Sequence, residues 1–495
     1  MAEEPHEISL NSTDQEEKKE MLLPEEKNII DSRDKMKKNI TVLRGISLVV
    51  GTMIGTGIFI TPNSITRRVN APATSIMVWL GGGVLAAVGG LVFSELGTMI
   101  PVSGSNVAYI KRIYGPVPSF IALWFLWFLL SGMIRSINVL AFVKYFWAIF
   151  YDDPDTEVNW WATKAVALSV FFIIVAVVTI KPTVILQSIV FFTFAKLAAC
   201  VIIIIAGFVS LAKGNTENIK LGFEDTNTDI RGWSEAFNAI VFSYAGWSQV
   251  CTVASEMKNP QREIPIVVCS SIALVTLIYV LTVTSFHIVV PLSVMTQNTA
   301  VASEFGLRTM GEAGKIVLAV GVVFSTLGNV QCSFLSATRM IHAGAAEGLL
   351  PSCFGLVSKR FKTPVVAILY IAAVASVFIV VGNINMLIST SSFAWFPFII
   401  ASSVGVIVMR VTHPDIPRPY RVPLILPVVF ALAESFVFIL PFLGEGWLMS
   451  LIWVFVALSG VPVYYLFSKN VFEWKILTWC NEKMERIISE TLDCD

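Results

Sequence analysis

Seven residues from Gly51 to Gly57 have a composition that suits a ligand site better than a membrane helix. The stretch reads Gly-Thr-Met-Ile-Gly-Thr-Gly and lies inside an apolar run from Val42 to Ile60. Glycine costs a helix about 1 kcal/mol relative to alanine, and hydrocarbon cannot hydrogen-bond to unpaired backbone. An interruption at membrane depth therefore predicts free N–H and C=O groups that line a cavity and can bind a polar ligand.

A second interruption, from Phe242 to Ser248, falls in the sixth apolar segment. It reads Phe-Ser-Tyr-Ala-Gly-Trp-Ser. Two broken helices at corresponding places, five segments apart, are typical of the binding site of a secondary transporter. The alternative is that these glycines serve close helix packing through small residues.

A zwitterionic amino acid fits the groups that two such breaks expose. Its carboxylate suits the N–H donors and the positive dipole end of a new half-helix, to which Thr56 adds a hydroxyl. Its ammonium suits carbonyl oxygens at the ends of the preceding half-helices. The predicted substrate-binding residues are Met53, Gly55, Thr56, Gly57, Phe242, Ser243 and Ala245.

Two basic residues lie inside apolar segments, Arg135 in the third and Lys196 in the fifth. Such residues are costly in a bilayer unless they face a cavity or a partner, although snorkelling or a structural hydrogen bond is the ordinary alternative. Lys196 could hold a fixed ammonium where sodium-coupled carriers bind a cation, or it could cycle a proton. For the substrate's side chain we predict a pocket containing Ser131, Arg135 and Trp395.

Length and composition indicate an all-α membrane protein. The chain has 495 residues, of which 55% are hydrophobic and 14% charged. A bilayer-spanning helix needs about 20 apolar residues, and twelve apolar segments are of about that length or longer: 42–60, 74–100, 117–150, 163–180, 184–211, 234–255, 264–290, 315–340, 364–382, 386–409, 423–442 and 447–468. We therefore expect a transmembrane domain over 42–468 between a disordered cytoplasmic tail, 1–41, and a C-terminal cytoplasmic tail, 469–495.

Other function classes find no support in the chain. The formal net charge is zero, which gives no reason to expect nucleic acid. The four histidines are scattered, and no nucleophile or phosphate-binding motif occurs, so we expect no metal, no cofactor and no catalytic residues. Two carboxylates in apolar segments are interpreted differently: Glu95 as structural and Glu434 as an interface residue.

The loops indicate how the chain sits in a membrane. Basic residues concentrate in the loops on the side of the termini, which predicts that both termini are cytoplasmic. No cysteine falls in a loop expected to face outward, so we expect no structural disulfide. Plasma membrane is the expected location.

Ordered motifs along residues 36–470 resemble the L-type amino acid transporters, the light chains of heteromeric amino acid transporters in the amino acid–polyamine–organocation superfamily. The motifs are residues 41–62, Ser94-Glu95-Leu96-Gly97-Thr98, Tyr114-Gly115-Pro116, Tyr244-Ala245-Gly246-Trp247, Ser255-Glu256-Met257-Lys258-Asn259-Pro260, Glu347-Gly348-Leu349-Leu350-Pro351, Arg418-Pro419-Tyr420-Arg421-Val422-Pro423 and Gly460-Val461-Pro462-Val463-Tyr464-Tyr465. The resemblance implies a LeuT-type fold of two inverted five-helix repeats plus two helices, with helices 1 and 6 broken. It also implies sodium-independent exchange, with Lys196 as the helix-5 lysine and Phe242 as the aromatic that closes over substrate.

The chain departs from this family at two places that bear on partner and substrate. Residues 151–163 contain no cysteine, whereas heterodimer-forming members carry one there that bridges to a glycoprotein heavy chain. Ser131-Gly132 stands where Arg-Pro is usual, and an arginine follows a turn later. We expect large neutral amino acids as substrates, no disulfide-linked heavy chain, and no obstacle to a non-covalent one. An exchanger of anionic amino acids and a transporter-like sensor are the alternatives.

Overall fold

The computed structural model describes residues 40–467 except 103, 127–129, 152–157, 181, 255–256, 299, 347–348, 359–360, 362 and 444–446. The predicted tails, 1–41 and 469–495, lie outside the described residues apart from Ile40 and Thr41. Over its described parts the chain is helical, and its one backbone bridge of the β type joins Ile40 to Met257.

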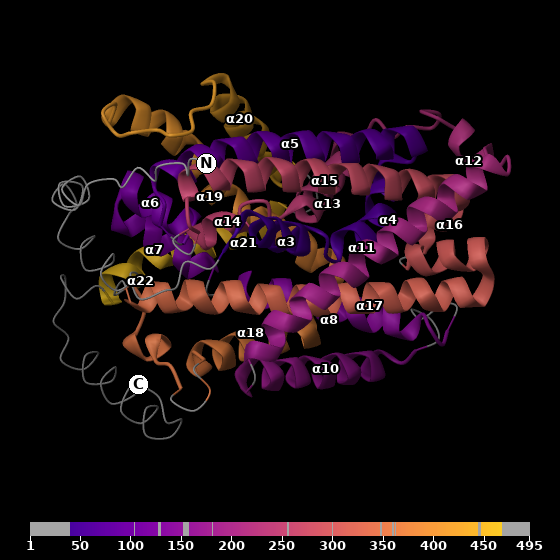
Figure 1. Ribbon diagram of the computed structural model, residues 1–495, viewed down its shortest axis with the longest axis horizontal. Coiled ribbons are helices and arrows are strands. Elements are labelled where there is room, and N and C mark those ends of the chain that lie inside the picture. The colour runs from indigo at the N-terminus through magenta and orange to yellow at the C-terminus, as the bar shows by residue number, and fades with distance from the viewer. Residues whose placement is uncertain are drawn as a thin grey trace, which may run out of the picture.

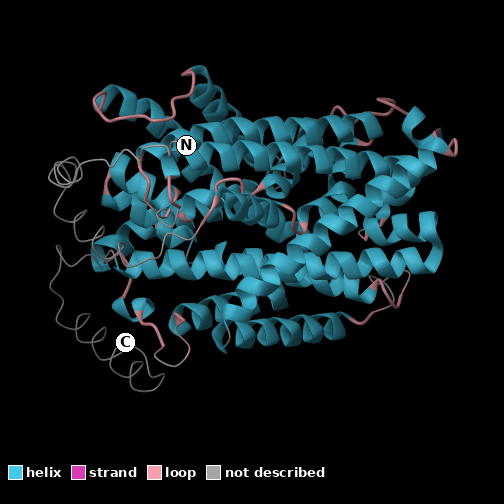
Figure 2. Ribbon diagram, viewed as in Figure 1, coloured by secondary structure: helices cyan, strands magenta, loops and turns pink. Residues whose placement is uncertain are grey.

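The helices form an elongated bundle whose longest members run side by side (Figures 1 and 2). Their bounds are α3 (Val42–Met53), α4 (Gly57–Val69), α5 (Pro72–Met99), α6 (Asn106–Tyr114), α7 (Pro116–Phe125), α8 (Ser131–Trp147), α10 (Trp160–Ile180), α11 (Pro182–Ala212), α12 (Glu217–Lys220), α13 (Ile230–Tyr244), α14 (Gln249–Thr252), α15 (Pro260–Val289), α16 (Leu292–Gln297), α17 (Val301–Ala346), α18 (Val365–Val381), α19 (Ile384–Thr412), α20 (Ile425–Leu443), α21 (Trp447–Leu458) and α22 (Gly460–Phe467). A 3₁₀ turn covers Ser352–Gly355. Helices α6 and α7 mark one end of the bundle, and α12 and α16 mark the other (Figure 1).

Local sequence signals account for where several helices begin. Thr41 caps α3, its hydroxyl accepting a hydrogen bond from Arg44 N at 3.5 Å. Asn383 caps α19 through Asn385 N at 2.9 Å. Proline stands in the first turn of α5, α7 and α15, where its missing N–H would have no partner within the helix.

The prediction of an all-helical, multi-pass membrane protein is confirmed. Within the described residues, eight helices are long and apolar enough to cross a membrane, and nine if the bent pair α3–α4 counts as one span. Each of the twelve predicted segments contains a helix, although the bounds differ. The predicted segment 315–340 is part of the longer α17, which runs from Val301 to Ala346 through a kink at Gly311, where φ is 68°.

The middle of the bundle is held by aromatic side chains from three helices. The rings of Trp79 in α5, Tyr244 in α13 and Tyr279 in α15 pack edge to face or tilted, with centroids 5.1 to 6.2 Å apart. All three are at most 2% exposed.

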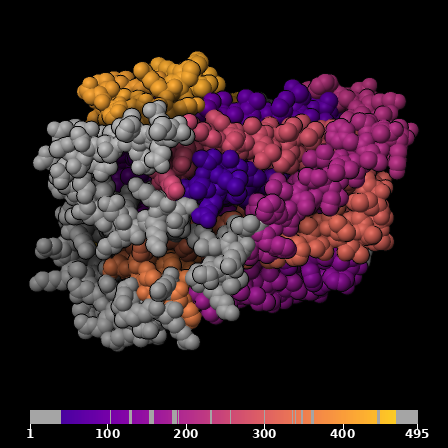
Figure 3. Space-filling model, viewed as in Figure 1, coloured from indigo at the N-terminus to yellow at the C-terminus, as the bar shows by residue number. Residues whose placement is uncertain are grey.

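On the visible face α3 reaches the surface between α15 and α11 (Figure 3). The short helix α3 is therefore packed among long ones, and its end lies inside the bundle.

Candidate functional site

The first predicted break is present in the structure. Helix α3 ends at Met53 and α4 begins at Gly57, and the two axes differ by 42°. Between them Gly55 N donates to Met53 O at 2.8 Å, and the next helix is initiated by Ile60 N, which donates to Thr56 O at 3.0 Å. The first N–H groups of any helix have no acceptor within it. The start of α4 therefore offers donors inside the bundle.

The second predicted break follows α13. That helix ends at Tyr244, and α14 begins at Gln249. The turn between them places Gly246 at φ 111°, a backbone conformation that favours glycine. A Cβ on Gly246 would also lie 2.9 Å from Thr52 Cγ2. The turn thus rests directly on the last residues of α3.

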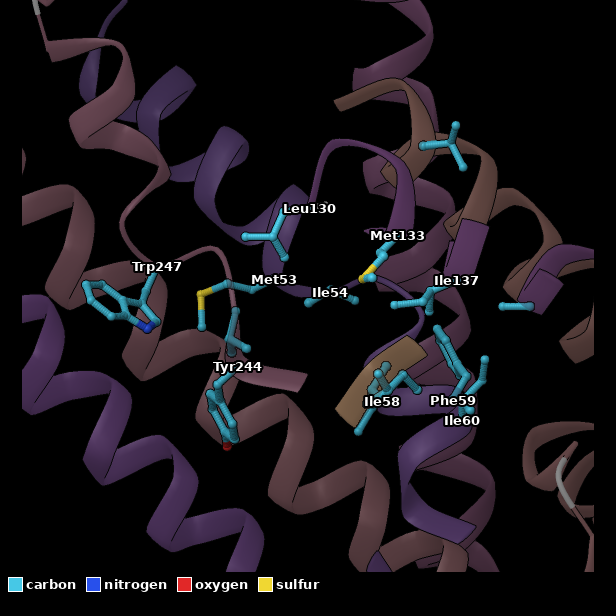
Figure 4. Packing of buried hydrophobic residues seen from close by; sticks show 14 of the residues in the cluster. Met53, Ile54, Ile58, Phe59, Ile60, Leu130, Met133, Ile137, Tyr244 and Trp247 are labelled. Carbon is cyan, nitrogen blue, oxygen red and sulfur yellow. The ribbon is translucent and has the colours of Figure 1, made fainter. Parts of the chain in front are cut away.

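The two breaks meet one another. A Cβ on Gly57 would lie 2.7 Å from Ser243 Cα, so only glycine allows this approach. Thr61 and Ser243 share a hydrogen bond between their hydroxyls at 2.7 Å. The Tyr279 hydroxyl lies 2.5 Å from Met53 O and 3.1 Å from Ser243 O, and can donate to either carbonyl. Met53 lies beside Tyr244 and Trp247 in this region (Figure 4).

Thr56 has a buried hydroxyl without a hydrogen-bond partner. The residue is 1% exposed, and its Oγ1 meets no donor or acceptor among the described residues. Buried polar atoms are nearly always paired, so an orphan at the start of a helix is a candidate contact for a polar ligand. A negatively charged group is favoured there by the helix dipole.

Lys196 lies against the end of α3 at the first break. Its Nζ donates to Gly51 O at 2.7 Å, and the residue is 1% exposed. Gly51 belongs to the last turn of α3, where carbonyl groups lack partners within the helix. A fixed ammonium at this end also complements the negative end of the α3 dipole. The lysine therefore occupies a position suited to a bound cation.

Arg135 is buried, but its guanidinium donates to carbonyl oxygens outside the two breaks. It is 3% exposed, and its Nη1 donates to Ser131 O at 2.6 Å while Nη2 donates to Ser333 O of α17. Its guanidinium lies 5.7 Å from the centre of the Phe334 ring, and Nε has no partner within the described part of the chain. Half-buried Trp395 of α19 makes no hydrogen bond or ring contact with either break among the described residues. Of the predicted side-chain pocket, the structure brings Arg135 and Ser131 together through a hydrogen bond, and Trp395 makes no such contact with them among the described residues.

Sequence reasoning missed residues that the fold brings to the breaks. Asn329 of α17 donates to Asn138 Oδ1 of α8 at 2.8 Å, and a Cβ on Gly55 would clash with its Nδ2. Ser325, one turn earlier, donates to Gly55 O at 3.4 Å. Neither these residues nor Tyr279 stands in a motif. The signal that could have found them is a polar side chain inside an apolar helix.

The class of protein follows from this geometry. A multi-pass helical bundle whose two broken helices meet, with an orphaned hydroxyl and a buried lysine at the first of them, has the construction of a membrane transport protein. Among the described residues no set of catalytic groups faces this site.

Comparison with known proteins makes the class specific. The model of the family described as amino acid permease matches residues 40–467, and the chain belongs to that family. It is 34% identical over 442 residues to the b(0,+)-type amino acid transporter 1 of Homo sapiens, covering 89% of this chain and 90% of the relative. It is 31% identical to the human cystine/glutamate transporter, with 87% and 85% covered, and 30% identical to the large neutral amino acids transporter small subunit 2 of Mus musculus, with 87% and 81% covered.

The comparisons confirm the resemblance to the light chains of heteromeric amino acid transporters. They identify a transporter and not an enzyme, and they favour amino acid transport over a sensor.

Proposed function

We propose that this chain exchanges large neutral amino acids across the plasma membrane by alternating access and without sodium. The proposal includes twelve transmembrane helices in a LeuT-type arrangement, with α3–α4 and α13–α14 as broken helices 1 and 6 and both termini cytoplasmic. The observation that carries it is the meeting of the two breaks at Gly57 and Ser243, next to Thr56, whose buried hydroxyl has no partner among the described residues.

Each half of a zwitterion has complementary groups in this proposal. The substrate carboxylate binds the N–H groups at the start of α4, beginning at Gly57, together with Thr56 Oγ1. The ammonium binds the carbonyl oxygens of Met53 and Ser243. The Tyr279 hydroxyl carries one proton and donates to one of these carbonyls at a time, which leaves acceptor capacity at the other.

The remaining predicted residues have supporting roles. Gly55 lets Asn329 approach the break, and Ala245 belongs to the turn of the second break. Half-buried Phe242 is the proposed aromatic cover over the substrate. Lys196 supplies the positive charge for which related carriers use sodium, through its hydrogen bond to Gly51 O.

Uptake by proteoliposomes that contain only the full-length chain tests this function. Vesicles preloaded with unlabelled leucine should take up labelled leucine or phenylalanine equally well in sodium and in choline medium. Flux that collapses in choline contradicts the sodium-independent mechanism. Saturable binding without any flux contradicts transport itself and favours the sensor.

An anionic substrate is the second candidate, and Arg135 is the observation that favours it. Its guanidinium is bonded to carbonyl oxygens, its Nε is unpartnered, and no carboxylate pairs with it among the described residues. One relative is a cystine/glutamate transporter. Competition against labelled leucine decides between the candidates: phenylalanine competing best supports neutral substrates, and glutamate or cystine competing best supports the anionic alternative.

A heavy-chain partner is a further part of the proposal. One relative is named a small subunit, and we propose that any association here is non-covalent. In the described part of the chain four cysteines are buried: Cys200, Cys251, Cys332 and Cys353. The fifth, Cys269, is exposed on α15, inside a membrane-span candidate. A bridge to another chain needs a cysteine that its partner can approach within about 4 Å between Cβ atoms.

A further inference from the structure

Glu434 lies in the middle of α20, in a helix apolar enough to span a membrane. It is 3% exposed, and its Oε2 is buried without a hydrogen-bond partner in the described part of the chain. The prediction that Glu434 lies at the membrane–water interface is therefore wrong. The residue lies mid-helix, and its side chain is turned into the bundle. An ionisable group at such depth is a candidate functional group.

The neighbours on its face show what Glu434 points at. Phe430, one turn before it, packs its ring 6.2 Å from Trp247 in the turn of the second break. Phe438, one turn after it, stacks on Phe393 of α19 at 4.8 Å. Residues four apart share a helix face, so the carboxyl group faces the bundle between the second break and α19. Helix α20 itself lies at the edge of the bundle beside α5 (Figure 1).

Among the described side chains, no positive charge is placed to neutralise this carboxylate. Helix α20 packs against α5, α13, α19 and α21. Glu95 of α5 and Arg410 of α19 form an ion pair with each other at 2.6 Å, and α21 has no titratable side chain.

The described titratable side chains of α13 are also engaged elsewhere. Glu235 pairs with Arg68, and the Tyr244 hydroxyl donates to Trp79 O at 2.9 Å. An unpaired buried carboxylate is far costlier than the neutral acid, so these surroundings favour the protonated form of Glu434.

We propose that Glu434 is a proton-binding site that holds a carboxylic acid in this conformation and releases the proton when the second break moves, so that proton transfer accompanies transport. The carboxylate takes one proton from water to become the acid and returns one proton to water on release, with no other reactant. The coupling to transport rests on the function proposed above. The binding of the proton does not, and the two are tested separately.

Infrared difference spectroscopy of the purified full-length protein tests the proton. A protonated carboxyl group has a carbonyl stretch that a carboxylate lacks and that shifts in D₂O. The wild-type minus Glu434→Gln spectrum at neutral pH should contain this band. Glu235→Gln is the matched control, since that exposed carboxylate is paired with Arg68, and its difference spectrum should contain only carboxylate bands. A wild-type minus Glu434→Gln spectrum with carboxylate bands alone overturns the proposal.

Proteoliposomes then test the coupling. An inward proton gradient should raise wild-type uptake of labelled leucine several-fold over uptake at equal pH, and Glu235→Gln should respond equally. Glu434→Gln should lose this stimulation, with each variant normalised to its own uptake at equal pH. A wild type indifferent to the gradient, or a Glu434→Gln variant that keeps the response, overturns the coupling. The acid band without amino acid flux of any kind would instead refute the proposed transport and leave the proton site standing.

Discussion

Replacing Lys196 by methionine should abolish most transport while the protein still folds. The substitution keeps an unbranched side chain of similar length and removes the ammonium that lies 2.7 Å from Gly51 O. That carbonyl belongs to the last turn of α3, immediately before the break. Without the Lys196 ammonium, the negative end of the α3 dipole has no positive charge from this side chain.

The expected fall in kcat/KM follows from the one hydrogen bond that Lys196→Met removes. A hydrogen bond to a charged group contributes about 1.5–3 kcal/mol. Because every 1.4 kcal/mol is a factor of ten, a loss confined to the substrate-bound state lowers kcat/KM by roughly 10- to 150-fold. A purely structural lysine would lower the thermal stability by a similar free energy and leave the kcat/KM of the folded fraction unchanged.

Lys164→Met is the matched control. Lys164 is also buried, and its Nζ donates to carbonyl oxygens at the end of a helix, Ile379 O at 2.6 Å and Gly382 O at 2.9 Å. It lies on α10, away from both breaks. Exchange in sodium and in choline, normalised to the reconstituted protein, is measured for both variants. Equal losses in both, or normal exchange by Lys196→Met, would refute the role assigned to Lys196.

Four further predictions concern the site and the partner. Thr56→Val should raise KM roughly 10- to 150-fold without lowering the melting temperature, since the hydroxyl has no partner among the described residues. Thr98→Val is the control: it removes an equally buried hydroxyl that is hydrogen-bonded to Glu95 O, and it should lower the stability alone. Gly57→Ala should abolish uptake because its Cβ would lie 2.7 Å from Ser243 Cα, whereas Gly81→Ala, with open space around its Cβ, should transport normally. Tyr279→Phe should raise KM about 5-fold, the equivalent of about 1 kcal/mol for a lost hydrogen bond. Tyr145→Phe, which loses a hydrogen bond to Phe59 O, should leave KM unchanged. Gels of the chain from its native membrane should show the same mobility with and without reductant, and a large complex that only a thiol reductant dissolves would contradict the non-covalent proposal.

The parts of the site that glycine determines can be predicted from the sequence. Both breaks are located within a few residues because glycine and polar residues interrupt long apolar runs. Lys196 can be placed because a lysine in the middle of such a run is too far from either end to snorkel easily, and therefore needs a polar partner at membrane depth. These inferences depend on local composition, and local composition is what a single sequence records.

The contacts between distant segments cannot be predicted in this way. Tyr279 lies 226 residues from Met53, and Asn329 lies 191 residues from Asn138; only the fold brings each pair together. The sequence places Arg135 in the pocket because it lies inside a span, but its hydrogen bonds join α8 to α17. Glu434 is misplaced because a sequence shows the depth of a residue only roughly and does not show which way its helix is turned.

The glycines of the first break serve packing and binding together, so these two roles are not exclusive. Gly55 and Gly57 are both needed for close approach, one by Asn329 and the other by Ser243. Packing alone would favour an apolar or paired side chain between them. The structure instead has Thr56 there, with a buried hydroxyl that no described protein group satisfies. Close packing gives no reason for that unpaired oxygen, whereas a bound substrate would supply its partner.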